Sequence, residues 1–210
     1  MASLIEEKEN SGANSPEDFI RTSARKLPLG ECYINERWFE SGKASIIVSR
    51  KHPDGKITCG FYLVDLYCLG VKDSFYLHAI RESEFENVLD EMSEKEGLLE
   101  VDYVLVHNII YGAVDFAGGY DFMVHKSFEL TSFLLEDDTE NIEFIEVPFG
   151  IEGKPGVIVS DADPQKDIIK LLKKNAGEGN YLVIEEKDFI PQSDGFDYEY
   201  SGAGNLDGKS

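Results

Sequence analysis

The stretch ASIIVSRKHPDGKITCGFYLVDL, residues 44–66, carries the strongest structural signal in the chain. Two runs rich in Ile, Val and aromatic residues, 44–50 and 56–66, flank KHPDG, whose Asp-Gly pair supplies the left-handed backbone geometry of a hairpin turn. The pattern therefore predicts an antiparallel pair of strands. From Phe61 onward both faces of the second run are apolar apart from Asp65, so we expect this strand to be covered on both sides and central in its sheet.

The segments on either side extend this pair to an α+β fold. Apolar residues at helical spacing predict helices over 82–94 and 100–117, and two glycines end the second helix. The other expected elements are strands at 32–35, 142–150, 154–160 and 181–186, a helix over 126–135, and a helix with Asp163 as its N-cap before Pro164. This order predicts an antiparallel sheet, a helical middle and a small C-terminal β-α-β unit.

One globular domain, residues 18–187, is expected between two flexible ends. The chain has 210 residues with 42% hydrophobic content, which is enough for one sizeable core. Residues 1–17 are polar without an apolar period, and residues 188–210 are acidic and rich in Gly, Ser and Asp. Neither end can bury enough apolar surface to offset the entropy of ordering, so we expect a flexible arm and a flexible tail.

Composition points to a cytoplasmic protein without a membrane span or a bound cofactor. No apolar run approaches the length of about 20 residues that a span needs, and the N-terminus lacks a charged-then-apolar leader. The three cysteines are an odd number without CxxC spacing, so we expect reduced thiols rather than disulfides. The four histidines lack ligand spacing, and we therefore expect no metal site.

The charge of the chain is unevenly distributed. The formal net charge is −21, yet residues 18–60 hold eight lysines and arginines against five acids. One interpretation is that basic surface residues happen to fall early in the chain; the other is an anion-binding face on an otherwise acidic protein. The residues proposed for such a face are Arg21, Arg25, Lys26, Arg50 and Lys51.

The strand end at YLVDLYCLGVKDSF, residues 62–75, is the most interesting place for chemistry. Cys68 follows Val64 and Leu66 in alternation, and such apolar surroundings raise a thiol pKa, so we favour a structural cysteine. An ionised Asp65 on an apolar face needs compensation. It could pair with Arg50 or Lys72, or it could serve as an acid or a metal ligand at the mouth of a cleft.

A catalytic set can also be assembled from residues near this strand end. It would consist of Asp65, Cys68, Lys72, Asp73 and His125. A nucleophile needs a base within hydrogen-bond reach, and the sequence alone does not establish that closeness. No nucleophile elbow, phosphate-binding loop or dinucleotide-binding fingerprint is present in the sequence to support a particular reaction.

Four motifs in order carry a resemblance to a known family: RxxARKLP at 21–28, Trp38 followed by SGxA, YLVDxxCLGVKD at 62–73, and HKxF at 125–128. From about residue 15 to about 185 the chain resembles a family of uncharacterised bacterial proteins that is common in Bacteroidetes. The resemblance implies a bacterial cytosolic protein and nothing about a reaction. The chain departs from the family pattern at its two glycines before HKxF, which leaves the length of the preceding helix open.

Two functional hypotheses of different class follow, and the first is preferred. The chain could be a non-catalytic binding or adaptor protein that uses its basic 21–56 face for an anionic partner, either RNA or an acidic protein surface. Alternatively it could be an enzyme with a polar site at the exit of strand 56–66, with hydrolysis among the reactions to test. A third option is assembly with itself, as a homo-oligomer, or with another protein.

Overall fold

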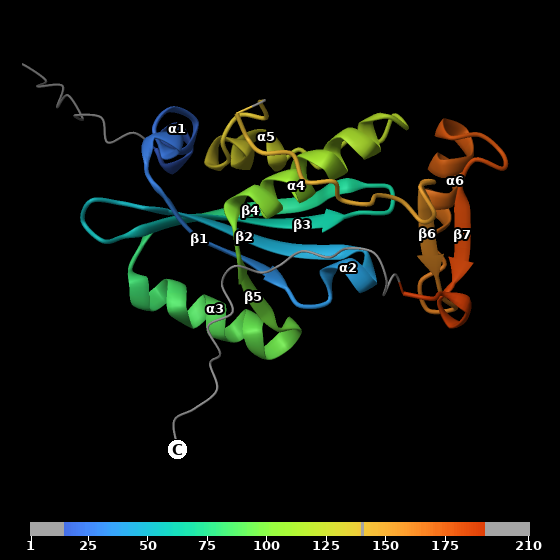
Figure 1. Cartoon of the computed structure of the whole chain (residues 1–210), viewed down its shortest axis with the longest axis horizontal. Coiled ribbons are helices and arrows are strands. Elements are labelled where there is room, and N and C mark those ends of the chain that lie inside the picture. Colours follow the sequence, from blue (N-terminus) through green and yellow to red (C-terminus); the bar gives the residue numbers. More distant parts are fainter. Residues whose placement is uncertain (1–14, 140, 192–210) are drawn as a thin grey trace, which may run out of the picture.

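The computed structural model describes residues 15–139 and 141–191, and these form an α+β fold (Figure 1). Five strands make an antiparallel sheet in the order β4-β3-β2-β1-β5. They are β1 (Leu29–Asn35), β2 (Lys43–Lys51), β3 (Ile57–Asp65), β4 (Gly70–Ile80) and β5 (Leu98–Val101). The expected mixed fold is therefore confirmed.

The helices precede, interrupt and follow this sheet, and the C-terminal unit comes last. They are α1 (Pro16–Thr22), α2 (Trp38–Ser41), α3 (Glu82–Glu96), α4 (Tyr103–Gly118), α5 (Phe128–Thr131) and α6 (Lys166–Asn175). Strands β6 (Gly156–Val159) and β7 (Leu182–Glu185) pair in parallel and, with α6 between them, form the expected β-α-β unit. In the part of the chain that the structure describes, no helix is both long and apolar enough to cross a bilayer.

Alternation along the central strands divides the core between the two faces of the sheet. Ile46 and Val48 of β2 pack with the apolar residues of α4, whereas Ile47 between them packs with α3. Helix α4 is buried over most of its length, as its apolar circumference predicts. Helix α3 covers only part of its face and leaves Leu63 39% exposed and Phe75 56% exposed.

The hairpin of residues 44–66 has the expected pairing and turn. Nine residue pairs join β2 and β3, and Gly55 has a φ of 81°, which a glycine adopts without strain. The next strand, β4, was not expected from the sequence. Because β4 pairs with β3, the latter lies second from the sheet edge rather than at its centre, and Cys68 belongs to the turn after β3 rather than to its strand.

Two β-bulges interrupt β4. The register passes from Leu63 opposite Asp73 to Val64 opposite Val71, which leaves Lys72 as the extra residue. The second shift falls near Ala79, whose φ of 50° lies in the left-handed region. The two bulges and the polar residues Lys72, Asp73 and Ser74 break the apolar alternation by which a strand is recognised in a sequence.

Two further expectations about the C-terminal half are wrong. Residues 142–150 form no strand, since this segment is held to α4 by side-chain hydrogen bonds instead of a ladder. The last helix starts at Lys166 with Gln165 as its N-cap residue, rather than with Asp163 capping Pro164. The N-terminal boundary also moves, because α1 begins at Pro16; residues 1–14 and 192–210 lie outside the described residues.

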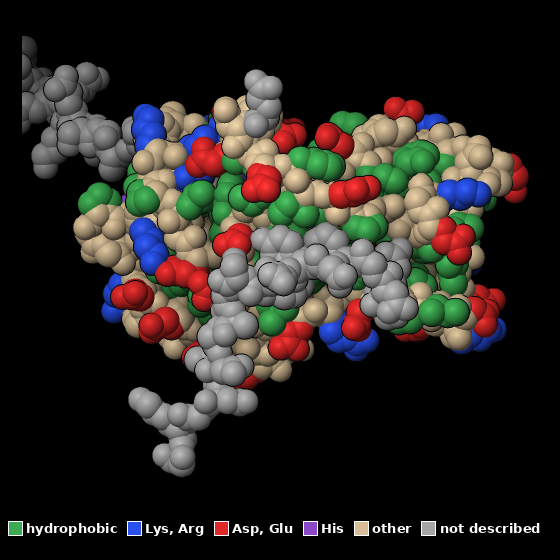
Figure 2. Space-filling model, viewed as in Figure 1, with side chains coloured by type: hydrophobic (Ala, Val, Ile, Leu, Met, Phe, Trp, Pro, Cys, Tyr) green, Lys and Arg blue, Asp and Glu red, His purple; other side chains and the backbone are tan. Residues whose placement is uncertain are grey.

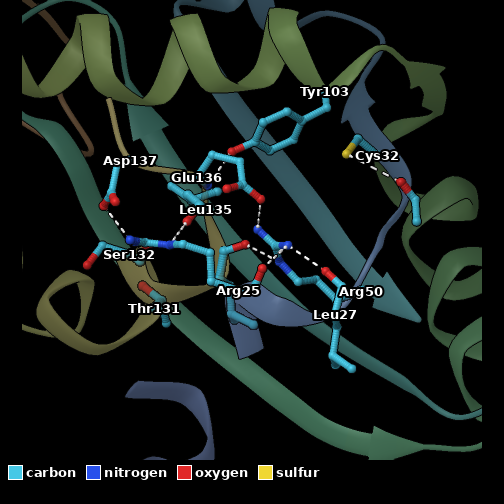
Figure 3. Close-up of polar contacts among 12 residues, drawn as sticks. Arg25, Leu27, Cys32, Arg50, Tyr103, Thr131, Ser132, Leu135, Glu136 and Asp137 are labelled. Atoms are coloured by element: carbon cyan, nitrogen blue, oxygen red, sulfur yellow. Dashed lines mark hydrogen bonds and ion pairs between the residues drawn. The ribbon is translucent and has the colours of Figure 1, made fainter. Parts of the chain in front are cut away.

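A buried arginine holds the N-terminal segment to the loop after α5 (Figure 3). Arg50 is 1% exposed, and its Nε donates to the Leu134 carbonyl at 2.8 Å. Its other nitrogens donate to the carbonyls of Arg25 and Leu27 at 3.1 and 2.8 Å and to the Glu136 carboxylate at 2.8 Å. Every nitrogen of the guanidinium therefore has an internal acceptor, which a buried charge requires.

A threonine between two histidines ties α1 to the far end of the hairpin. Thr58 Oγ1 accepts from the Ala79 amide at 3.0 Å and contacts His52 Nε2 at 2.7 Å and His78 Nδ1 at 3.2 Å. Phe19 of α1 packs on both imidazole rings. The Ala79 amide occupies one of the two lone pairs of Oγ1. One ring nitrogen can therefore donate to the remaining lone pair, and the other accepts the hydroxyl proton.

We expect Arg50→Gln to lower the free energy of unfolding by about 3 kcal/mol, since it leaves buried carbonyls and a carboxylate without their partner. Chemical denaturation measures the change. Arg37→Gln is the matched control, because Arg37 pairs with Glu40 at the surface and its side chain is 74% exposed. The control should lose less than about 0.5 kcal/mol. Equal losses in the two variants would contradict a structural role for Arg50.

Acid should destabilise the fold in the range where histidine titrates. Burial lowers the pKa of His52, His78 and His107 below 6.5, so the unfolded chain binds more protons and stability falls as the pH drops below about 6.5. We expect the melting temperature to decrease between pH 7 and 5.5. His52→Gln/His78→Gln should flatten this slope, because it removes two of these three imidazoles. A slope unchanged in the double variant would refute the contribution of the pair.

Candidate functional site

Asp65 at the end of β3 organises the turn that leads into β4. Its Oδ1 accepts hydrogen bonds from the amides of Tyr67, Cys68 and Leu69 at 3.0, 2.8 and 3.2 Å. The expected ion pair with Arg50 or Lys72 is not formed, because Arg50 is bound elsewhere and three backbone amides satisfy this carboxylate oxygen instead. The carboxylate thus sets the path of the turn.

The same turn is attached to the C-terminal unit. The carbonyl of Leu66 accepts from the Gly150 amide at 2.8 Å, and the carbonyl of Tyr67 accepts from the Gly156 amide at 3.0 Å. Cys68 packs in a cluster with Val157 of β6 and Leu172 of α6 among others. The end of the large sheet and the β-α-β unit therefore form one packed body at this place.

A cleft opens between these two parts. Its volume is about 50 Å³, and it adjoins a larger hollow of about 380 Å³ that shares Lys43, Ile158 and Gln165 with it. The lining of the smaller cleft consists of Lys43, Asp65, Tyr67, Cys68, Lys72, Gly156, Val157, Ile158, Gln165 and Ile168. A polar group of a ligand can enter the smaller part while its body occupies the larger one.

Two lysines from the strands on either side of β3 line this cleft. Lys43 lies on β2 opposite Asp65, and Lys72 is the bulged residue of β4. A bulge redirects a side chain relative to the regular ladder, which is why bulges are frequent beside functional sites. Within residues 15–139 and 141–191, neither lysine forms an ion pair with a carboxylate.

Tyr67 adds a hydroxyl that has no hydrogen-bond partner among the described residues. The side chain is 5% exposed, and burial together with the charge of Asp65 raises its pKa to about 12. Its ring lies over the backbone of Gly42, where a Cβ would come within 2.1 Å of the ring. A hydroxyl that is buried without a hydrogen-bond partner costs free energy, because it has lost its bonds to water. A ligand or a bound water that forms a hydrogen bond with it would recover part of this free energy.

Cys68 is a structural residue of this site. It is 1% exposed, and burial raises the pKa of its thiol well above the usual range. No histidine is among the residues that line the cleft. The thiolate that nucleophilic catalysis requires is therefore disfavoured here, as its apolar neighbours in the sequence predict.

Asp73 and His125 lie together, but not in the cleft. His125 Nδ1 contacts Ser127 Oγ at 2.8 Å and Asp73 Oδ1 at 3.3 Å. In a catalytic triad the two ring nitrogens bridge the hydroxyl and the carboxylate, whereas here one nitrogen contacts both. Asp73 is also 62% exposed at its side chain, so this group is a surface network at the start of α5. The structure thus separates the five expected catalytic residues into two places.

The five residues expected to bind anions do not form one accessible basic surface. Arg50 is buried, Arg25 binds the carbonyls of Ser132 and Leu135 and the carboxylate of Asp137, and Lys51 pairs with Glu31 at 2.5 Å. Arg21 and Lys26 remain exposed. On the face shown in Figure 2, basic side chains are scattered among acidic ones rather than gathered in a patch.

Three polar residues of the cleft were not expected from the sequence: Lys43, Tyr67 and Gln165. Lys43 could have been found by counting the hairpin outward from its turn, because this register places it opposite Asp65. No sequence pattern identifies Tyr67, since its environment depends on the C-terminal unit. Gln165 has a φ of 47°, and nothing in its neighbours predicts that conformation.

Comparisons with family models, with curated proteins and with solved structures found no match to this chain. The resemblance to a bacterial family through RxxARKLP and the other motifs stays a prediction.

We expect all three cysteines to resist modification in the folded protein. Cys32, Cys59 and Cys68 are buried, and burial raises the thiol pKa of each, to about 12 for the first two. A colourimetric disulfide reagent at pH 8 should label fewer than one thiol per chain in minutes and all three after unfolding in guanidinium. Rapid native labelling that disappears in Cys68→Ala would show an activated thiolate and revive the enzyme hypothesis.

Proposed function

We propose that this chain is a non-catalytic binding protein whose cleft beside the β3–β4 turn receives the anionic group of a small ligand, such as a phosphate or a carboxylate. The observation that carries the proposal is the convergence of Lys43 and Lys72 on one cleft, where neither lysine pairs with a carboxylate of the described residues. The cleft lies at the end of strand 56–66, where the sequence predicts a polar site. An anionic ligand also agrees with the anionic partner of the binding hypothesis.

The chemistry of the cleft fits an anion better than any other group. Two ammonium groups and one hydroxyl donate hydrogen bonds, whereas Asp65 directs one carboxylate oxygen to its own turn. A hydrogen bond to a charged group contributes about 1.5–3 kcal/mol, so each lysine contact corresponds to roughly tenfold in affinity or more. The small volume, about 50 Å³, admits a compact group and excludes a polymer backbone.

The residues of the cleft favour binding over catalysis. A buried thiol without a neighbouring base supplies no nucleophile, and the carboxylate of Asp65 is engaged by backbone amides. RNA and acidic protein surfaces are also less suitable partners than a small anion, because five of the eight lysines and arginines of residues 18–60 are paired with acids of the chain itself. Such pairs leave little positive potential over a wide surface.

We further propose that the protein acts in the bacterial cytoplasm. Three cysteines stay as free thiols in this fold, which suits a reducing compartment. The expected resemblance of RxxARKLP and the other motifs to a bacterial family is consistent with the same setting.

Titration calorimetry with pyrophosphate, phosphate, sulfate and citrate at low salt tests the site. We expect at least one of these anions to bind the native chain with 1:1 stoichiometry. Lys43→Gln/Lys72→Gln should weaken binding at least tenfold, since it removes both cations, and Tyr67→Phe should weaken it several-fold. Affinity should also fall with salt concentration.

Two control variants isolate the cleft. Lys95→Gln/Lys126→Gln removes the same charge from exposed positions elsewhere and should leave affinity within about twofold, because exposed charges are screened. Arg21→Gln/Lys26→Gln tests the N-terminal basic residues. Binding lost in the latter variant and kept in the cleft variant would transfer the anion site to the N-terminal segment; no binding by any anion would refute the proposal.

A further inference from the structure

A second hollow lies on the opposite side of α4 from the sheet, between this helix and the described residues 138–139 and 141–149. Its volume is about 330 Å³, which accommodates a small organic molecule. The helix contributes His107, Asn108, Tyr111, Gly112 and Asp115, and the facing segment contributes Asp138, Phe144, Ile145, Val147 and Phe149. None of these residues lines the cleft beside the β3–β4 turn.

Side-chain hydrogen bonds hold the two walls of this groove together. Asn108 donates from Nδ2 to the carbonyls of Val104 and Glu143 at 2.8 and 2.9 Å, and its Oδ1 accepts from the Ile145 amide at 3.0 Å. The Asn108 side chain thus satisfies backbone groups of Glu143 and Ile145, which do not belong to a strand ladder. The groove is therefore a built feature of the fold and not a gap between loose segments.

The walls are aromatic. Phe149 lies against α4 at Gly112, where a Cβ would come within 2.6 Å of the phenyl ring, so only glycine permits this packing. Tyr111 and Phe144 complete the aromatic lining, and Phe144 is 81% exposed. The exposed ring of Phe144 therefore extends the aromatic surface at the rim of the groove.

His107 supplies an unsatisfied polar group at this groove. It is 2% exposed, and its Nε2 has no hydrogen-bond partner among the described residues. Burial lowers the pKa of the imidazole, an effect that the nearby charge of Asp138 and a hydrogen bond with the Glu136 backbone partly oppose. At neutral pH the ring is uncharged and can accept one hydrogen bond.

The charged residues of the lining are both acids, Asp115 and Asp138. They occupy different ends of the groove, since Asp115 follows His107 by eight residues, about two helical turns. Asp138 is the carboxylate whose charge acts on His107. One end therefore combines a carboxylate with an imidazole nitrogen that lacks a partner.

We propose that this groove is a binding site for a small organic ammonium compound with an aromatic or apolar body. The body packs against Tyr111 and Phe149, where an aromatic face also attracts a cation. The ammonium group donates to the Asp138 carboxylate and to His107 Nε2, and it thereby satisfies the buried nitrogen. This site is independent of the anion cleft and has the opposite charge preference.

A matched series of three compounds tests the charge preference: phenethylammonium, phenethyl alcohol and 3-phenylpropionate. All three share the ring and the two-carbon linker and differ in one terminal group. Chemical-shift titration of the ¹⁵N-labelled full-length chain gives the affinities and locates the site. We expect the ammonium compound to bind at least tenfold more tightly than the alcohol, the carboxylate not to bind, and the His107 ring resonances to shift.

Variants then identify the recognising groups. Asp138→Asn should lower the affinity for phenethylammonium at least tenfold, whereas Asp90→Asn, which removes the same charge from exposed α3, should leave it unchanged. His107→Asn, verified to be folded by circular dichroism, should weaken the ammonium compound and leave the alcohol unaffected. Equal binding of the three compounds, no binding of the ammonium compound, or full affinity in Asp138→Asn would overturn the proposal.

Discussion

One carboxylate oxygen of Asp65 accepts hydrogen bonds from three consecutive backbone amides. The arrangement of the β3–β4 turn and of the C-terminal unit beside it follows from this interaction. The amides fix the turn after β3, so that the carbonyls of Leu66 and Tyr67 face the C-terminal segment and bind it. The C-terminal β-α-β unit has only two strands, and a parallel pair of this size is not stable without a larger partner. Its attachment to the turn therefore provides the packing that it lacks.

The charges of the chain serve the fold before they serve recognition. Arg50 is enclosed by three carbonyls and one carboxylate, and Arg25 beside it binds the same loop after α5. Removal of such an ion from water is costly, and only complete hydrogen bonding makes it tolerable. The number of basic residues in the sequence is therefore a poor guide to the positive charge at the surface, because residues such as Arg25 and Arg50 bind acceptors of the chain itself.

Local chemistry explains why some elements could be predicted and others could not. The hairpin of residues 44–66 and the helix at 82–96 depend on alternation, turn residues and helical spacing that lie within the segments themselves. Strand β4 escaped because two bulges and a polar centre break its alternation. The buried state of Cys68 could be predicted from its neighbours, but its cluster with β6 and α6 could not. Likewise, the partition of Asp65, Cys68 and Lys72 from Asp73 and His125 depends on tertiary contacts between distant segments.

The interruptions in β4 also affect how the molecule meets its own copies. This strand ends the sheet, and a long, regular sheet end with an exposed Phe75 would be a template for fibrous association in a crowded cell. Between Lys72 and Ala79 the ladder is regular only from Asp73 to Leu77, and a charged residue starts that stretch. An incoming strand finds no continuous row of groups to match. The same bulge that places a lysine at the cleft therefore also makes this sheet edge a poor partner for another strand.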